Sequence, residues 1–218
     1  MKSDSTLAIT LFGPPTATLN NQPIHIGRRN AVALLAYLAA TQRRHSRAHL
    51  VALLWPEYDE AGARGELRRA VSTLNRALGA QWIAADRHNV TLPAAPGLQV
   101  DVLTFRMHIA AARAGATESG AKLQAAVALA QAEFMAGFAL DDAPDFEEWQ
   151  RFETGALRRE LAWALEQLSQ PTAEQDAAQA LVHAERWLAL DPLDEAAHRR
   201  LMELHATAGD LSAAHRQY

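Results

Sequence analysis

The chain has 218 residues, of which 49% are hydrophobic, enough for two compact domains with apolar cores. Cysteine is absent, which excludes disulfides, thiolate nucleophiles and zinc–thiolate sites. The net charge of −4 is unevenly distributed: residues 1–100 hold 11 Lys or Arg against 6 Asp or Glu, and residues 101–218 hold 10 against 19. This asymmetry predicts a polyanionic partner for the first half alone, although two soluble domains of unrelated charge are the alternative.

Membrane spans and secretory signals are not indicated by the sequence. The first residues lack a basic stretch followed by an apolar one, and no apolar run approaches 18 residues. We therefore expect a soluble, cytoplasmic protein without a membrane partner.

Short β-strands are predicted at the start of the chain. Apolar residues alternate over 7–11, an extended run follows at 17–19, and a returning strand is expected at 24–26. The pair Asn20-Asn21 between the last two runs favours a tight turn, because Asn tolerates the left-handed backbone region.

Three helices and a hairpin are predicted next. The period of apolar residues changes at 30–41, Ser46 is placed to cap a second helix that ends before Pro56, and a third helix is expected at 61–78. Beyond it, short strands at 82–83 and 90–92 flank a hairpin tip at residues 86–89. The order of strands, three helices and hairpin is that of a winged helix, which we place at residues 1–100.

The remaining residues, 101–218, are alanine-rich and predicted to be all helical. Asp176 and Asp210 lie 34 residues apart, as do Ala180 and Ala214, and 34 is the period of tetratricopeptide (TPR) repeats. Because the second repeat stops at Tyr218, we expect a domain truncated at its C-terminus. The predicted fold class is mainly α with a small β component, a winged helix followed by a TPR-like domain. The expected helices span 102–113, 120–136, 146–169, 173–190, 195–208 and 211 onward.

The third predicted helix has the residues of a DNA reader. Its apolar stripe faces away from a side that carries Arg69, Ser72, Thr73 and Arg76, whose side chains can hydrogen-bond base edges in the major groove. These four residues are the predicted base contacts, and an ordinary solvated helix surface is the alternative. Contacts to the DNA backbone are expected from residues at helix ends, in loops and in the hairpin tip: Arg28, Arg29, Arg43, Arg44, Arg47, Arg64, Arg68, Arg87, His88 and Asn89.

Signatures of catalysis are missing from the sequence. It has no glycine-rich phosphate loop, dinucleotide-binding motif or nucleophile elbow. His45 and His49 have metal-ligand spacing but no third ligand nearby, and the acidic residues at 141–148 fit a helix cap better than paired catalytic carboxylates. We predict that the protein is not an enzyme and has no cofactor and no metal site. Four aromatic residues at helical spacing are expected in the core rather than in a ligand groove: Trp149, Phe152, Trp163 and Trp187.

The sequence resembles a known family along nearly its whole length. It is similar to the antibiotic regulatory protein (SARP) type of bacterial activator, in which an OmpR-like winged helix is joined to a TPR-like bacterial transcriptional activation domain. Among the segments that carry the resemblance are Leu53-Leu54-Trp55-Pro56, Leu67-Arg68-Arg69-Ala70, Val100-Asp101-Val102, Glu148-Trp149 and Leu190-Asp191-Pro192-Leu193-Asp194-Glu195.

This resemblance implies binding to promoter DNA, often at direct repeats and hence as a homodimer on DNA, and activation through contact with RNA polymerase. Gly65-Glu66 departs from the family pattern, which has a polar or basic pair just before Leu67. The Glu66 carboxylate would repel a nearby phosphate unless it accepts from a cytosine amino group. A protein–protein scaffold that binds partners through its helical repeats, without DNA readout, is the alternative function. The basic balance of residues 1–100 and the arginine in the hairpin argue against it.

Overall fold

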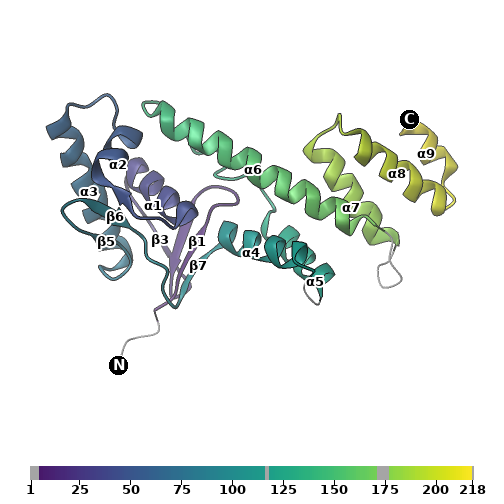
Figure 1. The fold of residues 1–218 in the computed structure, drawn as a ribbon, viewed down its shortest axis with the longest axis horizontal. Coiled ribbons are helices and arrows are strands. Elements are labelled where there is room, and N and C mark those ends of the chain that lie inside the picture. Colours follow the sequence, from purple (N-terminus) through teal and green to yellow (C-terminus); the bar gives the residue numbers. More distant parts are fainter. Residues whose placement is uncertain (1–4, 116–117, 171–176, 218) are drawn as a thin grey trace. The chain divides into compact units, whose positions relative to one another are not determined.

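The computed structural model describes residues 5–115, 118–170 and 177–217. The chain divides into two compact units, which are described separately (Figure 1). The first combines Met1–Thr104 with Gln131–Thr154, and the second combines Phe105–Ala130 with Gly155–Tyr218. The predicted fold class, mainly α with a small β component, is confirmed. Within the described residues, no helix is both long and apolar enough to span a membrane.

A small sheet opens the first unit. It has four strands in the order β3-β2-β1-β7, with β1 antiparallel to β2 and parallel to β7. The predicted turn is confirmed, because Asn20 and Asn21 both have positive φ, 51° and 63°, as a two-residue type I′ hairpin requires. The third strand begins two residues before its expected start. The strands are β1 (Leu7–Thr10), β2 (Thr16–Leu19), β3 (Gln22–Ile24) and β7 (Leu98–Val100).

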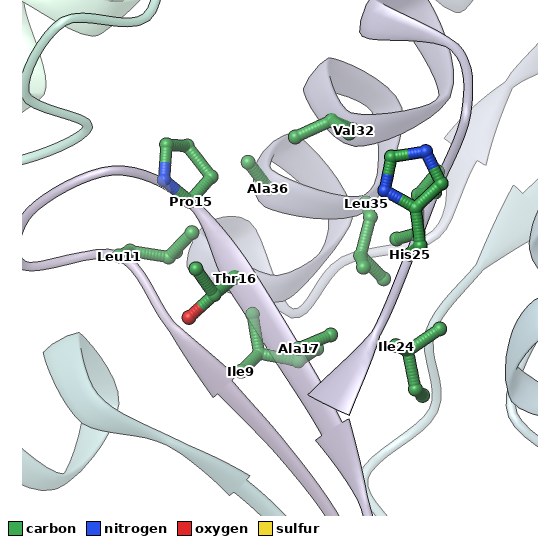
Figure 2. A pocket seen from close by; sticks show the side chains of 11 residues that line it. Ile9, Leu11, Pro15, Thr16, Ala17, Ile24, His25, Val32, Leu35 and Ala36 are labelled. Carbon is green, nitrogen blue, oxygen red and sulfur yellow. The ribbon is translucent and has the colours of Figure 1, made fainter. Parts of the chain in front are cut away.

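Helix α1 (Arg29–Thr41) lies at the centre of this unit. Every residue from Ala33 to Ala40 is buried, so the helix is covered on all its sides. Helices α2 (Arg47–Leu54) and α3 (Glu60–Leu78) pack against it. Figure 2 shows α1 facing the sheet across a cavity of about 220 Å³, which Leu35 and Ile9 line from opposite sides.

The predicted hairpin is present, but its first strand lies at 84–85 instead of the expected 82–83, and it gains a third strand. Strands β5 (Ala84–Ala85) and β6 (Asn89–Thr91) are antiparallel, and β4 (His45–Ser46) pairs with the other edge of β6. The two-residue β4 is too short to produce an alternating pattern in the sequence. Ser46 also caps α2 as predicted, since its Oγ accepts from the backbone N–H of His49 at 3.1 Å. We call β4, β5, β6 and the 86–88 tip the wing.

The predicted helix at 120–136 is wrong in its second half. Helix α5 (Ser119–Leu129) ends earlier, and the chain then pairs with the loop after β1. The backbone N–H of Gly13 donates to Glu133 O at 2.9 Å, and that of Met135 donates to Leu11 O at 2.7 Å. Met135 is fully buried at a positive φ of 51°, so tertiary packing and backbone pairing override the local helix propensity of the alanines.

The start of helix α6 (Pro144–Leu168) completes the first unit through aromatic contacts. The ring centroid of Trp149 lies 4.8 Å from that of Tyr37 on α1, 5.8 Å from that of Phe134 and 5.2 Å from that of Phe146. This packing attaches residues 131–154 to the winged helix, beyond the domain boundary expected at residue 100. The expectation that Phe152 lies in the core is wrong, because its side chain is 71% exposed.

The second unit consists of helices, joined in part as TPR-like pairs. Helices α7 and α8 enclose a core that includes Ala184 and Leu201, and α8 packs on α9. Asp194 and Asp210 cap α8 and α9 through backbone N–H groups. The expected helix start at residue 173 and the repeat residue Asp176 lie outside the described residues. The remaining helices are α4 (Asp101–Arg113), α7 (Ala177–Leu190), α8 (Glu195–Thr207) and α9 (Leu211–Arg216).

A partly buried carboxylate connects the strand-forming N-terminus to the start of α4. Asp101 accepts from the backbone N–H groups of Leu11 at 2.8 Å, Phe12 at 2.9 Å and Val102 at 2.7 Å. Burial raises the pKa of Asp101, and these three donors oppose the shift. The side chain therefore fixes the end of β1 where the 133–135 segment also pairs.

Replacing Asp101 by alanine should lower the free energy of unfolding by about 2–4 kcal/mol, because three partly buried N–H donors lose their acceptor. Asp101→Asn should cost less, since the amide keeps one acceptor oxygen. Urea unfolding followed by tryptophan fluorescence measures both. The control is Asp142→Ala, an exposed aspartate of the same unit. A loss below about 0.5 kcal/mol for Asp101→Ala would contradict this role.

Candidate nucleic-acid interface

Helix α3 presents one buried face and one exposed face. The predicted apolar stripe is confirmed, because Leu67, Val71, Leu74 and Leu78 are all buried. Asp59 caps the start of the helix, since its carboxylate accepts from the N–H of Gly62 at 2.8 Å, and Gly79 caps the end.

The four predicted base-contacting side chains differ in their exposure and in their hydrogen bonds within the protein. Arg69, Ser72 and Arg76 are exposed on the side opposite the stripe. Thr73 is half-buried, and its hydroxyl donates to the carbonyl of Arg69 at 2.9 Å. The Arg76 guanidinium and the Ser72 hydroxyl are thus unengaged on a single helix face, whereas the Arg69 guanidinium on the same face pairs with Glu66. We call this face the reading face. Its residues are Arg69, Ser72, Thr73 and Arg76.

A cationic cleft separates α3 from the wing. Its volume is about 700 Å³, and four arginines from three elements contribute to its walls, with no aspartate or glutamate among the lining residues. Space of this kind suits the sugar–phosphate backbone of a nucleic acid, since guanidinium groups pair with phosphate oxygens in a fixed geometry. The cleft is lined by Ser46, Arg47, Ala48, Arg64, Leu67, Arg68, Arg87, His88 and Asn89.

Asp86 orders the tip of the wing. One carboxylate oxygen accepts from the N–H groups of His88 and Asn89, each at 2.7 Å, and the other pairs with Arg44. Arg47 donates from Nε to the Asp86 carbonyl at 2.8 Å. The backbone donors, with a smaller contribution from Arg44, lower the pKa of Asp86 to about 2. Sequence analysis gave Asp86 no role, although an Asp two and three residues before its donors is the pattern of a turn-stabilising carboxylate.

The remaining predicted backbone contacts have different surroundings. Arg28 pairs with Glu66 at 3.3 Å. Arg29 donates to Ala139 O at 2.5 Å, and its guanidinium carbon lies 5.4 Å from the centre of the Phe138 ring. Arg29 therefore holds the 131–154 segment in place rather than joining the cleft. Arg43 is exposed beside the wing.

The two histidines with metal-ligand spacing contact hydroxyl groups. His49 Nε2 shares a hydrogen bond of 2.8 Å with the Tyr37 hydroxyl, and His45 Nε2 shares one of 2.8 Å with the Thr41 hydroxyl. Their rings stack with centroids 5.6 Å apart. Burial, and then the nearby charges of His49 and Arg43, lower the pKa of His45. The part of the chain that the structure describes contains no group of three residues suited to hold a metal ion.

The Asp86 carboxyl should titrate with a midpoint near 2 instead of its ordinary 3.8. A lowered pKa in the folded state means that the stabilisation is complete above about pH 4 and is lost as the pH falls through about 2. NMR titration of the side-chain carboxyl carbon measures the midpoint. Arg44→Ala should raise it modestly, because the backbone donors remain, whereas Arg43→Ala, the neighbouring arginine, should leave it unchanged. A wild-type midpoint near 4 would show that the tip is not ordered as described.

Comparisons with known proteins agree with this architecture. The family model described as "Bacterial transcriptional activator domain" matches residues 100–218. The solved structure of Mycobacterium tuberculosis EmbR in complex with low affinity phosphopeptide matches 98% of this chain, with a TM-score of 0.76 and 22% sequence identity. This chain covers 58% of that protein's chain, and the likeness shows a shared fold. The search of curated proteins found no match. The chain belongs to the bacterial transcriptional activator domain family.

Proposed function

We propose that the first unit is a sequence-specific reader of duplex promoter DNA. In this proposal α3 enters the major groove, the cationic cleft receives the DNA backbone, and the wing follows the neighbouring groove. The observation that carries the proposal is the position of the reading face next to a cleft lined by four arginines. Because the family is one of transcriptional regulators, DNA readout gives this surface a direct use.

The reading face and the cationic cleft would contribute differently to DNA binding. Arg69 and Arg76 can each form a forked pair with guanine, which contributes about 1–3 kcal/mol of discrimination per base. The arginines of the cleft would neutralise phosphates, an attraction that is independent of sequence and decreases with salt. Asp86, Arg44 and Arg47 would hold the wing in its binding geometry, so that less conformational entropy is lost on association.

The second unit would contact RNA polymerase. Residues 105–130 and 155–218, which make up this unit, carry 9 basic and 11 acidic side chains and so have no basic excess that would attract DNA. Several large apolar side chains of this unit are exposed, as is common at protein–protein contacts: Val182 at 60%, Leu193 at 88% and Leu211 at 70%. Two copies bound at direct repeats would present two such surfaces to the polymerase.

Selection from random duplex DNA tests the proposal. The purified chain is mixed with random duplexes at two salt concentrations, and the retained pool is sequenced. Convergence on a motif, with affinity that falls steeply as salt rises, supports DNA readout. Failure to retain any duplex at low salt would overturn it and would leave the protein–protein scaffold as the function.

The double change Arg69→Ala/Arg76→Ala should abolish preference for the selected motif while leaving weak binding to all duplexes. The reason is that the guanidinium forks of the reading face are lost and the cleft is intact. Competition binding between the motif and random DNA measures the preference. Arg158→Ala/Arg159→Ala, which removes two exposed arginines of α6, is the charge-matched control. Retained preference in the first variant would contradict the assignment of these base contacts.

The double change Arg68→Ala/Arg87→Ala should weaken binding to every duplex about equally. If both cleft arginines contact phosphates, the slope of log affinity against log salt should become shallower by about 0.9 for each. Binding titrations at four or more salt concentrations, on the motif and on random DNA, measure the slope. A loss confined to the motif would instead place these residues at base edges.

A further inference from the structure

Glu66 lies at one edge of the reading face and bridges two arginines. One carboxylate oxygen accepts from Arg69, three residues later on α3, at 2.5 Å. The other accepts from Arg28, the residue before α1, at 3.3 Å. Glu66 is 20% exposed, whereas the two guanidinium groups are 54% and 52% exposed. Arg69 is thus oriented by a partner that is itself held by a second element.

A carboxylate beside a DNA-reading arginine needs a physical explanation, because it repels phosphates and base acceptors alike. The hydrogen bond from Arg69 lowers the pKa of Glu66, so the group is charged at neutral pH. Glu60, the other acid of α3, pairs with Arg64 in the first helical turn. Of the two acids of α3, Glu66 is the one that pairs with a residue of the reading face.

The geometry leaves the carboxylate able to accept further hydrogen bonds. Two carboxylate oxygens offer about four acceptor positions, and each oxygen uses one for an arginine. In the major groove, cytosine presents an amino donor without a ring-nitrogen acceptor beside it. Adenine presents a donor and an acceptor together, and guanine and thymine present acceptors at the corresponding edge. Of the four bases, cytosine suits a carboxylate best.

We propose that Glu66 and Arg69 read two neighbouring bases as one unit, with Glu66 accepting from a cytosine amino group while Arg69 donates to an adjacent guanine. This inference rests on the proposed DNA readout and names part of its target. Glu66 would then act by rejection as well as attraction, because a guanine or thymine at the cytosine position places an acceptor against the carboxylate. The repulsion would also weaken binding to random DNA, which widens the gap between target and other sequences.

The variant Glu66→Gln tests this pairing, because the amide has the same shape, no charge, and a donor where the carboxylate has none. Selection with the wild-type chain should yield a motif with a cytosine next to a guanine. The variant should lose about tenfold or more of its discrimination at the cytosine position alone. It should also bind random duplexes more tightly. Glu60→Gln, the matched acid on the same helix, should leave preference at that position unchanged.

A chemical probe distinguishes direct readout from an indirect effect on Arg69. A duplex with N4-methylcytosine at the selected position has a methyl group in place of the groove-facing amino hydrogen. It should bind the wild-type chain about tenfold more weakly or worse, and should affect Glu66→Gln much less. Thermal unfolding by circular dichroism shows whether both variants are folded.

The outcomes separate the two proposals. If the wild-type chain selects no motif, the proposed DNA readout fails, and this inference fails with it. If the wild-type chain selects a motif and Glu66→Gln selects the same one with the same discrimination, the inference alone is overturned, and Glu66 is a surface ion-pair partner.

Discussion

The first unit depends on the burial of α1 on every side. A helix that packs against a sheet, two other helices and an aromatic segment needs short side chains wherever backbones approach closely, and the run Ala31 to Ala40 supplies alanine at half of its positions. The leucines and Tyr37 fill the wider spaces between the alanines. Because α3 packs on this helix, the direction of the reading face is set by the packing of the core beneath it. The sizes of the side chains packed around α1 therefore determine where the arginines of α3 lie on the surface.

The arginines of this unit fall into two groups: some are hydrogen-bonded within the protein, and others are exposed without such bonds. Arg29, Arg44 and Arg47 donate to backbone carbonyls or to Asp86 and hold loops in place. Arg68 and Arg76 are exposed and have no hydrogen bond or ion pair that would compete with a ligand. An arginine that is held by the protein costs less entropy to order at an interface, and a free arginine gains more from each new contact. The candidate DNA-binding surface contains arginines of both groups.

Much of the fold follows from local patterns in the sequence. The turn at Asn20-Asn21, the cap at Ser46, the apolar stripe of α3 and the hairpin all depend on residues close together in the chain, and the structure confirms them. The segment 130–143 could not be predicted, because its conformation depends on backbone partners more than 100 residues earlier. Local alanine propensity indicated a helix there.

In the candidate site too, features set by residues close in sequence were predictable, and features set by distant contacts were not. The reading face was recognisable from helical periodicity, since its residues share one element. The separation of Arg29 from the cleft depends on Ala139 and Phe138, which no local pattern connects to it. Glu66 was recognisable as an exception to the family pattern. Its bridge between Arg28 and Arg69 required the position of α1 relative to α3.

The discontinuous first unit also sets an order of events during synthesis. Strand β1 is among the first segments to leave the ribosome, yet its partner β7, the carboxylate of Asp101 and the 133–135 segment emerge about 90 to 125 residues later. Until then, the backbone donors of Leu11 and Gly13 lack these partners, and the ring of Tyr37 lacks Trp149, which emerges later still. Contacts of such sequence separation close slowly. The nascent winged helix therefore stays incompletely packed until the segment that follows α5 has been synthesised. A gene fragment ending at residue 100 would encode the reading face without the segment that completes the packing of this unit.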